Sequence, residues 1–302
     1  MTATVPAPAL PPTGRRGPGL AGMITLGLGL FGLLWGITRL ATAPLDATLI
    51  AYLVGGVVLL VAFVSIERTV TDPMLDLSLF RVPMMTPSLL AAMFQALANY
   101  AVLFLVIMYL QGPRGLSPIH TSLLLVPGYV IGGCIGPYAG QLADRVAPVL
   151  PALGLGIQVV ALFAHAQLSL HTGLWLVVLA SIANGVGAGF FFPGNSSAVM
   201  KASPPQLFGI SSGMLRTFSN VGMVFSFSLA ILIASRSISR TLAFAIFVGS
   251  TSLHGPLAVA FTSGLHAAFY ASMGLMVIAA LLSLTRAGRG MRDSRSVPEP
   301  AA

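Results

Sequence analysis

Eight long stretches of this 302-residue chain carry almost no charge, and this feature limits the possible folds more than any other. A helix needs roughly 20 apolar residues to cross a bilayer core about 30 Å thick, where every backbone polar group must be bonded within the segment. The sequence therefore predicts an all-α integral membrane protein with eight transmembrane helices. These helices are expected at residues 20–38, 47–66, 88–110, 119–141, 148–168, 174–194, 211–234 and 264–285.

The composition excludes a soluble fold and several kinds of site. Only 7% of the residues are charged and 56% are hydrophobic, against roughly 25% charged in soluble domains. The net charge of +8 comes from basic residues in the gaps between apolar stretches, so we interpret it as a membrane-orientation signal and expect no nucleic-acid partner. Cys134 is the single cysteine, which excludes an internal disulfide. The five histidines lack metal-site spacing, so we expect no metal and no cofactor; they are His120, His165, His171, His254 and His266.

The distribution of basic residues predicts the orientation. With the N-terminus inside the cell, the inner segments hold ten of the fifteen Lys and Arg residues, the outer segments hold four, and Arg216 lies within a predicted helix. The positive-inside rule then places both termini in the cytoplasm of a multi-pass plasma-membrane protein. Residues 241–262 are also apolar, but His254-Gly255-Pro256 interrupts them. We expect this segment to be external, and either interfacial or partly re-entrant.

The chain divides into five parts. Because three is an odd number, the fourth to sixth helices of a six-helix unit begin on the opposite side of the membrane from the first three. Two three-helix repeats of inverted topology are a common plan of secondary transporters. The predicted parts are a disordered tail at 1–19, a two-helix pair at 20–66, a cytoplasmic linker at 67–87, a six-helix unit at 88–285 and a basic tail at 286–302.

Three segments resemble one transporter family. Gly140-Gln141-Leu142-Ala143-Asp144-Arg145 is similar to the G-x-L-A-D-R loop of the major facilitator superfamily, although Val146-Ala147-Pro148-Val149 follows where that family has Gly and two basic residues. Residues 190–200 and 209–230 resemble later helices of the same half. Over residues 20–285 the chain looks like the C-terminal portion of fourteen-span drug:proton antiporters of the EmrB/QacA type. The resemblance implies drug or small-molecule efflux by alternating access, and not an enzyme.

The acidic residues bear on whether this portion works alone. None of the seven Asp and Glu residues lies within a predicted span, whereas proton-coupled antiport needs a group that exchanges a proton inside the membrane. We therefore expect a half or truncated transporter that acts with a complementary six-helix half, or as a homodimer, on a small amphipathic substrate in the lipid bilayer. The alternative is a non-transporting fragment that packs with another membrane protein.

Polar residues inside the apolar stretches are the candidates for the substrate cavity, because each must face protein or water. Gln95 and Asn99 share one face of their helix; Asn184, Phe191 and Asn195 share a face of another. The resemblance implies that these two helices line the cavity. Interhelical hydrogen bonding is the competing role. Gln158 and His165 lie on a helix that the resemblance places at the periphery, so packing is expected for them.

The remaining candidates for gating, helix packing and proton coupling lie mostly near the predicted cytoplasmic surface or in a series of regularly spaced glycines. Gly140, Asp144 and Arg145 form either a gate or a solvated turn. Arg216, roughly 8 Å deep, either snorkels to the surface or contacts the substrate or a gating carboxylate, and we expect it to pair across the interface between halves. Gly132 and Gly136 precede Gly140 at spacings of four and predict close packing against another helix. His266 is the one histidine that we single out for proton coupling.

Overall fold

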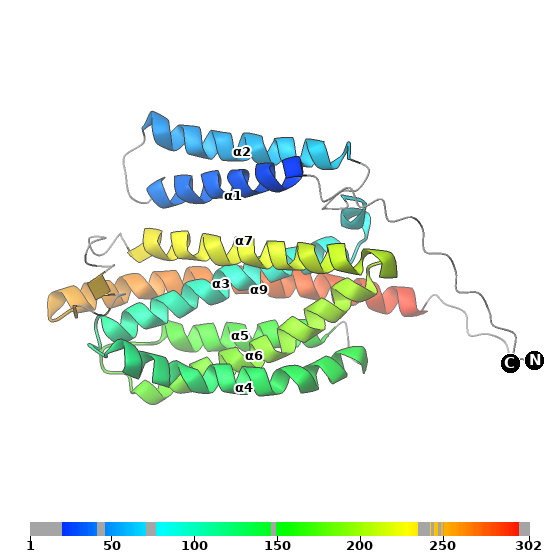
Figure 1. Cartoon of the computed structure of the whole chain (residues 1–302). Helices are drawn as coiled ribbons and strands as arrows, with labels where there is room; N and C mark the ends of the chain where they lie inside the picture. Colours follow the sequence, from blue (N-terminus) through cyan, green and yellow to red (C-terminus); the bar gives the residue numbers. More distant parts are fainter. Residues whose placement is uncertain are drawn as a thin grey trace, which may run out of the picture.

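The computed structural model describes residues 20–40, 46–70, 77–145, 149–234, 242, 245–246, 249 and 251–295. In this part of the chain the secondary structure is helical throughout, and each predicted span corresponds to one α-helix (Figure 1). The predicted disordered tail at 1–19 lies outside the described residues. The helices are α1 (Leu20–Leu40), α2 (Ala47–Glu67), α3 (Met85–Gln111), α4 (Pro118–Arg145), α5 (Leu150–Ala166), α6 (Leu174–Lys201), α7 (Phe208–Ala234) and α9 (Pro256–Arg295), with 3₁₀ turns η1 (Leu77–Arg81) and η2 (Pro205–Leu207).

Several of these helices have the length and apolar character of membrane spans. Among the described residues, α2, α3, α4, α6 and the part of α9 up to Thr285 meet both criteria, while α1 and α5 contain shorter apolar stretches. Large apolar side chains such as Phe31, Val61 and Leu281 are more than half exposed on the outer faces. Such a surface is expected where lipid covers the protein, and the architecture supports an integral membrane protein.

The segment before the last helix differs from the expectation. Pro256 begins α9, because its ring fixes φ at a helical value and its missing N–H is not needed in the first turn. Residues 256–262 are therefore the start of α9, and Ile246 and Leu253 are among the described residues that precede it. Leu253 donates its backbone N–H to the carbonyl of Gly112 at 3.1 Å, and Ile246 is fully buried. These two residues thus cover the end of α3. At its other end, α9 continues ten residues beyond the predicted span.

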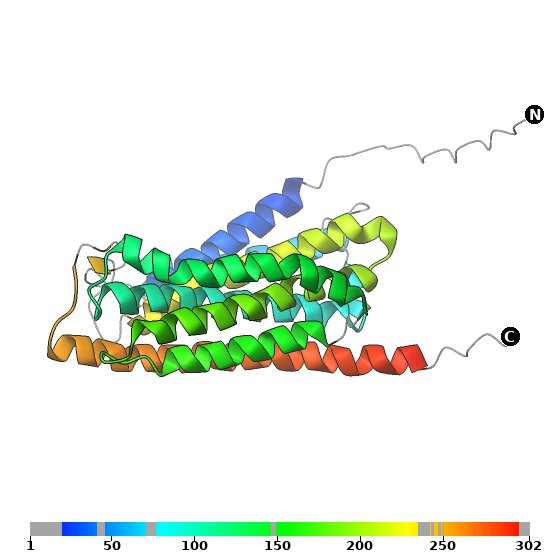
Figure 2. The same ribbon diagram turned by 90° about the horizontal axis from the view of Figure 1, so that it is seen from below.

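In the six-helix unit, α3 contacts each of the other five described helices, and α1 and α2 form a pair beside α7 (Figure 1). Within this unit the most extensive contacts are those of α4 with α6, α5 with α6, α3 with α7, and α9 with both α3 and α5. α9 runs along the whole length of the six-helix unit (Figure 2). The first turn of α1 and the last turn of α9 lie at the same end of the bundle (Figure 1). The largest apolar cluster joins α3, α5, α6 and α9 and includes Leu105, Met108, Leu162, Phe191 and Phe269.

Glycine allows two of these helix pairs to approach closely. A Cβ atom on Gly132 of α4 would lie 2.7 Å from the carbonyl oxygen of Gly185 on α6, and one on Gly189 would lie 2.9 Å from that of Gly132. Gly154 on α5 and Gly187 on α6 meet in the same way. No other residue type would permit this backbone contact without displacement. α6 is thus held between α4 and α5, and this fixes the direction in which its polar side chains point.

The α1–α2 pair is held by its own contacts. A Cβ atom on Gly32 would lie 3.3 Å from the Cα of Gly56 in α2. In the last turn of α1, Arg39 pairs with Asp46, the residue before α2, at 2.9 Å. The Asp46 carboxylate also accepts a 2.7 Å hydrogen bond from the backbone N–H of Leu49, and so caps the N-terminus of α2.

Candidate functional site

A cavity of about 390 Å³ lies between α3, α4 and α6, with one side chain from α5 in its wall. Its volume is in the range of small-molecule sites. Most of the wall is apolar or glycine, and a few polar groups converge on it. The lining consists of Asn99, Tyr100, Val102, Leu103, Val106, Leu125, Gly128, Tyr129, Gly132, Gly133, Gly136, His165, Ser181, Asn184, Gly185, Ala188, Gly189, Phe192 and Pro193.

Glycines on α4 explain why a cavity forms beside so close a helix contact. Gly132 touches the backbone of α6, but Gly133 and Gly136 have no atom within 4 Å of the position that a Cβ would occupy. The first glycine therefore brings the two helices together, and the other two leave space where side chains would otherwise stand. Gly140, one turn further along, has only Pro193 near its Cβ position, at 3.9 Å.

Four amide side chains from three helices form a hydrogen-bonded cluster at this cavity. Asn184 Nδ2 donates to Asn99 Oδ1 at 2.8 Å. Gln158 Nε2 donates to Asn184 Oδ1 at 3.2 Å and lies 3.5 Å from Asn99 Oδ1. Gln95 Nε2 donates to Gln158 Oε1 at 3.3 Å. Asn99 and Asn184 line the cavity, whereas Gln95 and Gln158 are fully buried behind them. We call these four residues the amide cluster.

The local sequence explains how the amide cluster forms. Gln95 and Asn99 lie one turn apart on α3 and so share a face. The Gln158 side chain extends from α5 across Gly187 of α6. A Cβ atom on Gly187 would lie 2.6 Å from the Gln158 Cγ. Because Gly187 has no side chain, the Gln158 amide reaches Asn184 on the next helix. Polar groups buried between membrane helices are expected to bond to each other in this way.

The other two cavity candidates from the sequence occupy different places. Phe191 is fully buried in the core cluster, and its neighbours Phe192 and Pro193 line the cavity instead. Asn195 is buried and donates from Nδ2 to the backbone carbonyl of Ser88 at 3.1 Å, which connects α6 to α3. In this structure it serves as a helix-to-helix bond.

Sequence reasoning missed two polar residues of α5. Gln158 lies at the centre of the amide cluster, and His165 is in the cavity wall. The sequence predicts packing for both, because the resemblance places this helix at the periphery, and the Gln158 bonds and the stack of His165 on Phe269 are interhelical contacts of that kind. Their spacing of seven residues was the available signal, since it puts two polar side chains on one face of an otherwise apolar helix.

The gate candidates are not among the residues that line the cavity. Asp144 and Arg145 end α4, and their side chains lie outside the described part of the structure. Arg216 is exposed on α7, which begins three residues earlier than predicted, at Phe208. His266 Nε2 lies 2.6 Å from the carbonyl oxygen of Leu168, so this histidine ties α9 to the α5–α6 connection. The described residues contain no group of three or more potential metal ligands.

The relatives of this chain are transporters and drug-resistance proteins. It is 31% identical to an uncharacterized MFS-type transporter of Mycobacterium tuberculosis over 76% of its length. It is 28% identical to the lincomycin resistance protein LmrB of Listeria monocytogenes over 79%, and 25% identical to the tetracenomycin C resistance and export protein of Streptomyces glaucescens over 72%. No protein-family model matches the chain. These similarities support the major facilitator superfamily.

The match covers only part of each relative. The aligned residues make up 40%, 50% and 41% of those three proteins, so the chain spans half or less of the length of the curated relatives it matches.

The amide cluster leads to a stability prediction. Replacing Gln158 by Leu removes bonds to two neighbouring helices and leaves Gln95 Nε2 and Asn184 Oδ1 without the partners they have in the cluster. Interhelical bonds in membranes contribute about 0.6–1.7 kcal/mol, and an orphaned buried amide costs about 1–3 kcal/mol. We expect Gln158→Leu to lower the free energy of unfolding by about 1–3 kcal/mol, measured by denaturant titration of the purified chain. Gln167→Leu is the control, because that side chain is exposed and bonds only the Tyr270 hydroxyl. Equal stability of the two variants would contradict this role of the amide cluster.

Proposed function

We propose that this chain belongs to the major facilitator superfamily and forms the C-terminal portion of an exporter of the fourteen-span drug:proton antiporter type. In this proposal it moves drugs or other small amphipathic molecules across the plasma membrane by alternating access. The observation that carries the proposal is the cavity between α3, α4 and α6, whose wall is mostly apolar or glycine and to which Asn99 and Asn184 contribute hydrogen-bonded amides. The names of the relatives support efflux as the activity.

The helix contacts support an arrangement of two inverted repeats, α3–α4–α5 and α6–α7–α9. In this arrangement α3 corresponds to α6, α4 to α7, and α5 to α9. Exchanging the repeats turns the α4–α6 contact into the α7–α3 contact, and the α5–α6 contact into the α9–α3 contact. All four of these pairs are major contacts of the unit. The pair α5–α9 is unchanged by the exchange and is also in contact. A packing pattern that survives this exchange is expected of internally repeated transporters, whose substrate site lies where the repeats meet.

The proposed orientation has both termini, the linker at 67–87 and the tail at 286–302 in the cytoplasm. It is supported by the excess of basic residues in the inner segments. The position of the first turn of α1 and the last turn of α9 at one end of the bundle agrees with it (Figure 1). Gly140, Asp144 and Arg145 then end α4 at the cytoplasmic side, where we propose that they act with Arg216 as a gate toward a complementary half.

The proposed transport cycle divides the work between two halves. In this half, the apolar wall takes up the rings or chains of the substrate, and the amides of Asn99 and Asn184 bond its polar groups. A complementary six-helix half closes the open side of the cavity. It also supplies the proton-exchanging carboxylates, because the predicted spans of this chain contain none. Rocking of one half against the other exposes the cavity to each side in turn.

Dye efflux tests the proposal. Cells would express this chain alone, a six-span complementary half alone, or both together, and would be loaded with a panel of lipophilic dyes. We expect efflux that depends on the proton gradient only when both halves are present. Efflux by this chain alone would overturn the requirement for a partner half. An absence of efflux in every combination, with both proteins in the membrane, would favour a non-transporting protein that packs with other membrane proteins.

A further inference from the structure

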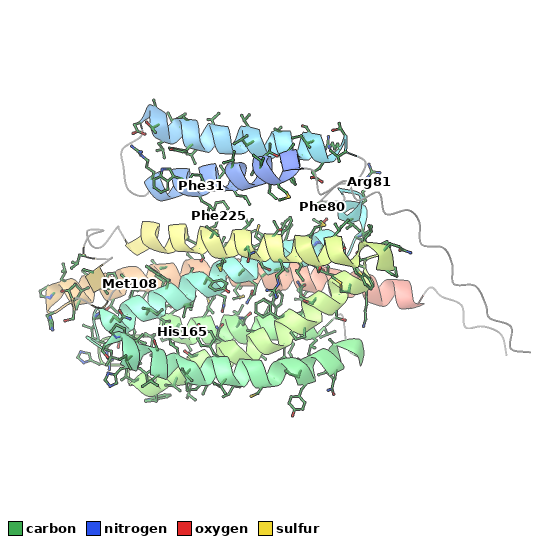
Figure 3. All side chains as sticks on the ribbon, viewed as in Figure 1. Phe31, Phe80, Arg81, Met108, His165 and Phe225 are labelled. Atoms are coloured by element: carbon green, nitrogen blue, oxygen red, sulfur yellow. The ribbon has the colours of Figure 1, made fainter. Side chains whose placement is uncertain are left out.

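One cavity residue is not used by the proposed function. His165 of α5 is 2% exposed and belongs to the cavity wall. Figure 3 shows it in the interior of the helical bundle. Its ring stacks on Phe269 of α9, with centroids 6.1 Å apart and planes 21° from parallel. Packing against Phe269 holds the imidazole plane in one orientation.

The hydrogen bond of one ring nitrogen defines the chemistry of the other. His165 Nδ1 lies 2.9 Å from the backbone carbonyl oxygen of Ala161. A carbonyl only accepts hydrogen bonds, so Nδ1 carries the proton, and Nε2 of the neutral ring presents a lone pair. Because Ala161 is one turn back on the same helix, Nδ1 faces the backbone of α5 and Nε2 points away from it. Nε2 is buried and has no hydrogen-bond partner in the described residues.

The position of His165 relative to the amide cluster gives the cavity two polar ends. His165 follows Gln158 by seven residues on the same face of α5, which corresponds to about 10 Å along the helix axis. Asn99 and Asn184 bond Gln158 at one level, and the imidazole lies at the other. The rest of the wall is mostly apolar and includes Val102, Leu103 and Val106.

We propose that His165 is a specificity-determining residue of this cavity and that its Nε2 accepts a hydrogen bond from the substrate. The substrate class is an amphipathic molecule with an apolar body, an N–H or O–H donor at one end and a polar group for Asn99 and Asn184 about 10 Å away. This inference rests on the proposed function. A buried acceptor without a partner is unfavourable, and a ligand donor removes that cost, so ligands that lack the donor bind more weakly.

The other histidines do not have these properties. His266 is bonded through Nε2 to the Leu168 carbonyl, and His120 is exposed and bonded to the Ser117 hydroxyl. His171 and His254 are exposed in connections between helices. His165 is therefore the histidine of the described chain that combines burial, a place in the cavity wall and a buried ring nitrogen without a hydrogen-bond partner.

A matched pair of ligands tests the inference. The probes are an aminocoumarin dye, which has an N–H donor, and its N,N-dimethyl analogue, which has none. Their binding is measured by fluorescence, and their export in cells that also express the complementary half. We expect the chain to favour the donor-bearing dye by about tenfold, which corresponds to 1.4 kcal/mol. His165→Phe keeps an aromatic ring against Phe269 and is expected to bind both dyes equally. His165→Gln retains an acceptor and is expected to keep part of the preference, and His171→Phe to keep all of it.

The outcomes separate this inference from the proposed function. If both dyes bind and are exported equally by the unmodified chain, or if the preference survives in His165→Phe, the role of His165 is overturned and the exporter proposal stands. If neither dye binds or is exported, both proposals are overturned. If thermal melting shows that His165→Phe is poorly folded, the dye preference of His165→Gln is compared with that of His171→Phe instead. A preference in His165→Gln as large as in His171→Phe would contradict the inference.

Discussion

Replacing Gly132 by Ala is expected to lower the free energy of unfolding of the chain by about 1–3 kcal/mol, the usual cost of overpacking. The added Cβ would lie 2.7 Å from the carbonyl oxygen of Gly185, inside the contact between α4 and α6. Backbone atoms on both sides prevent a small local adjustment, so the two helices must separate. Since α6 carries Asn184, this separation also lengthens the bonds of the amide cluster.

The neighbouring glycine provides the matched control. A Cβ on Gly133 has no atom within 4 Å, and Ala is favoured over Gly in a helix by up to about 1 kcal/mol. Gly133→Ala is therefore expected to leave stability unchanged or to raise it. Thermal melts of the two purified variants, followed by helical circular dichroism, distinguish these effects. Equal melting temperatures for Gly132→Ala and Gly133→Ala would show that the α4–α6 contact does not depend on glycine.

The helices were predictable from the sequence because the bilayer imposes a simple rule. An apolar stretch that spans it must satisfy its own backbone, and only a helix does so within one segment. The helix ends were less predictable. The helices extend to Lys201 in α6 and Arg295 in α9, well past the apolar windows, because apolarity stops at the membrane surface while helical hydrogen bonding continues into polar sequence.

The cavity was predictable only in part. Spacing along single helices was enough to pair Gln95 with Asn99 and to select Asn184. It could not show that α5 turns Gln158 toward α6, because the orientation of a helix in a bundle depends on its neighbours. The glycine series on α4 predicted close packing, but its partner, Gly185, became known only from the structure. Phe191 shares a face with Asn184 by spacing, yet the way α6 packs places it in the core.

Filling the cavity is expected to have the largest effect on transport. Gly136 lines the cavity, and its Cβ position has no atom within 4 Å. A phenyl ring there occupies space that the proposed substrate needs, and it does so without an immediate clash with the backbone. A loss of 1.4 kcal/mol of substrate binding corresponds to a tenfold loss of affinity. We expect Gly136→Phe to reduce transport about tenfold or more, and Gly136→Ala to reduce it much less.

The control is a glycine of α5 that has free space around its Cβ position but does not line the cavity. Gly156 is exposed, and its Cβ position also has no atom within 4 Å. Gly156→Phe therefore adds the same side chain to the outer surface of the six-helix unit. Both variants are compared at equal amounts in the membrane, together with the complementary half.

The rate of dye efflux from these cells tests most directly whether this cavity is the substrate site of an exporter half. The predicted result is strong loss of efflux in Gly136→Phe, a mild effect in Gly136→Ala and an unchanged rate in Gly156→Phe. Equal efflux rates for Gly136→Phe and Gly156→Phe would contradict the account, because the substrate would then pass through the protein without entering the cavity between α3, α4 and α6.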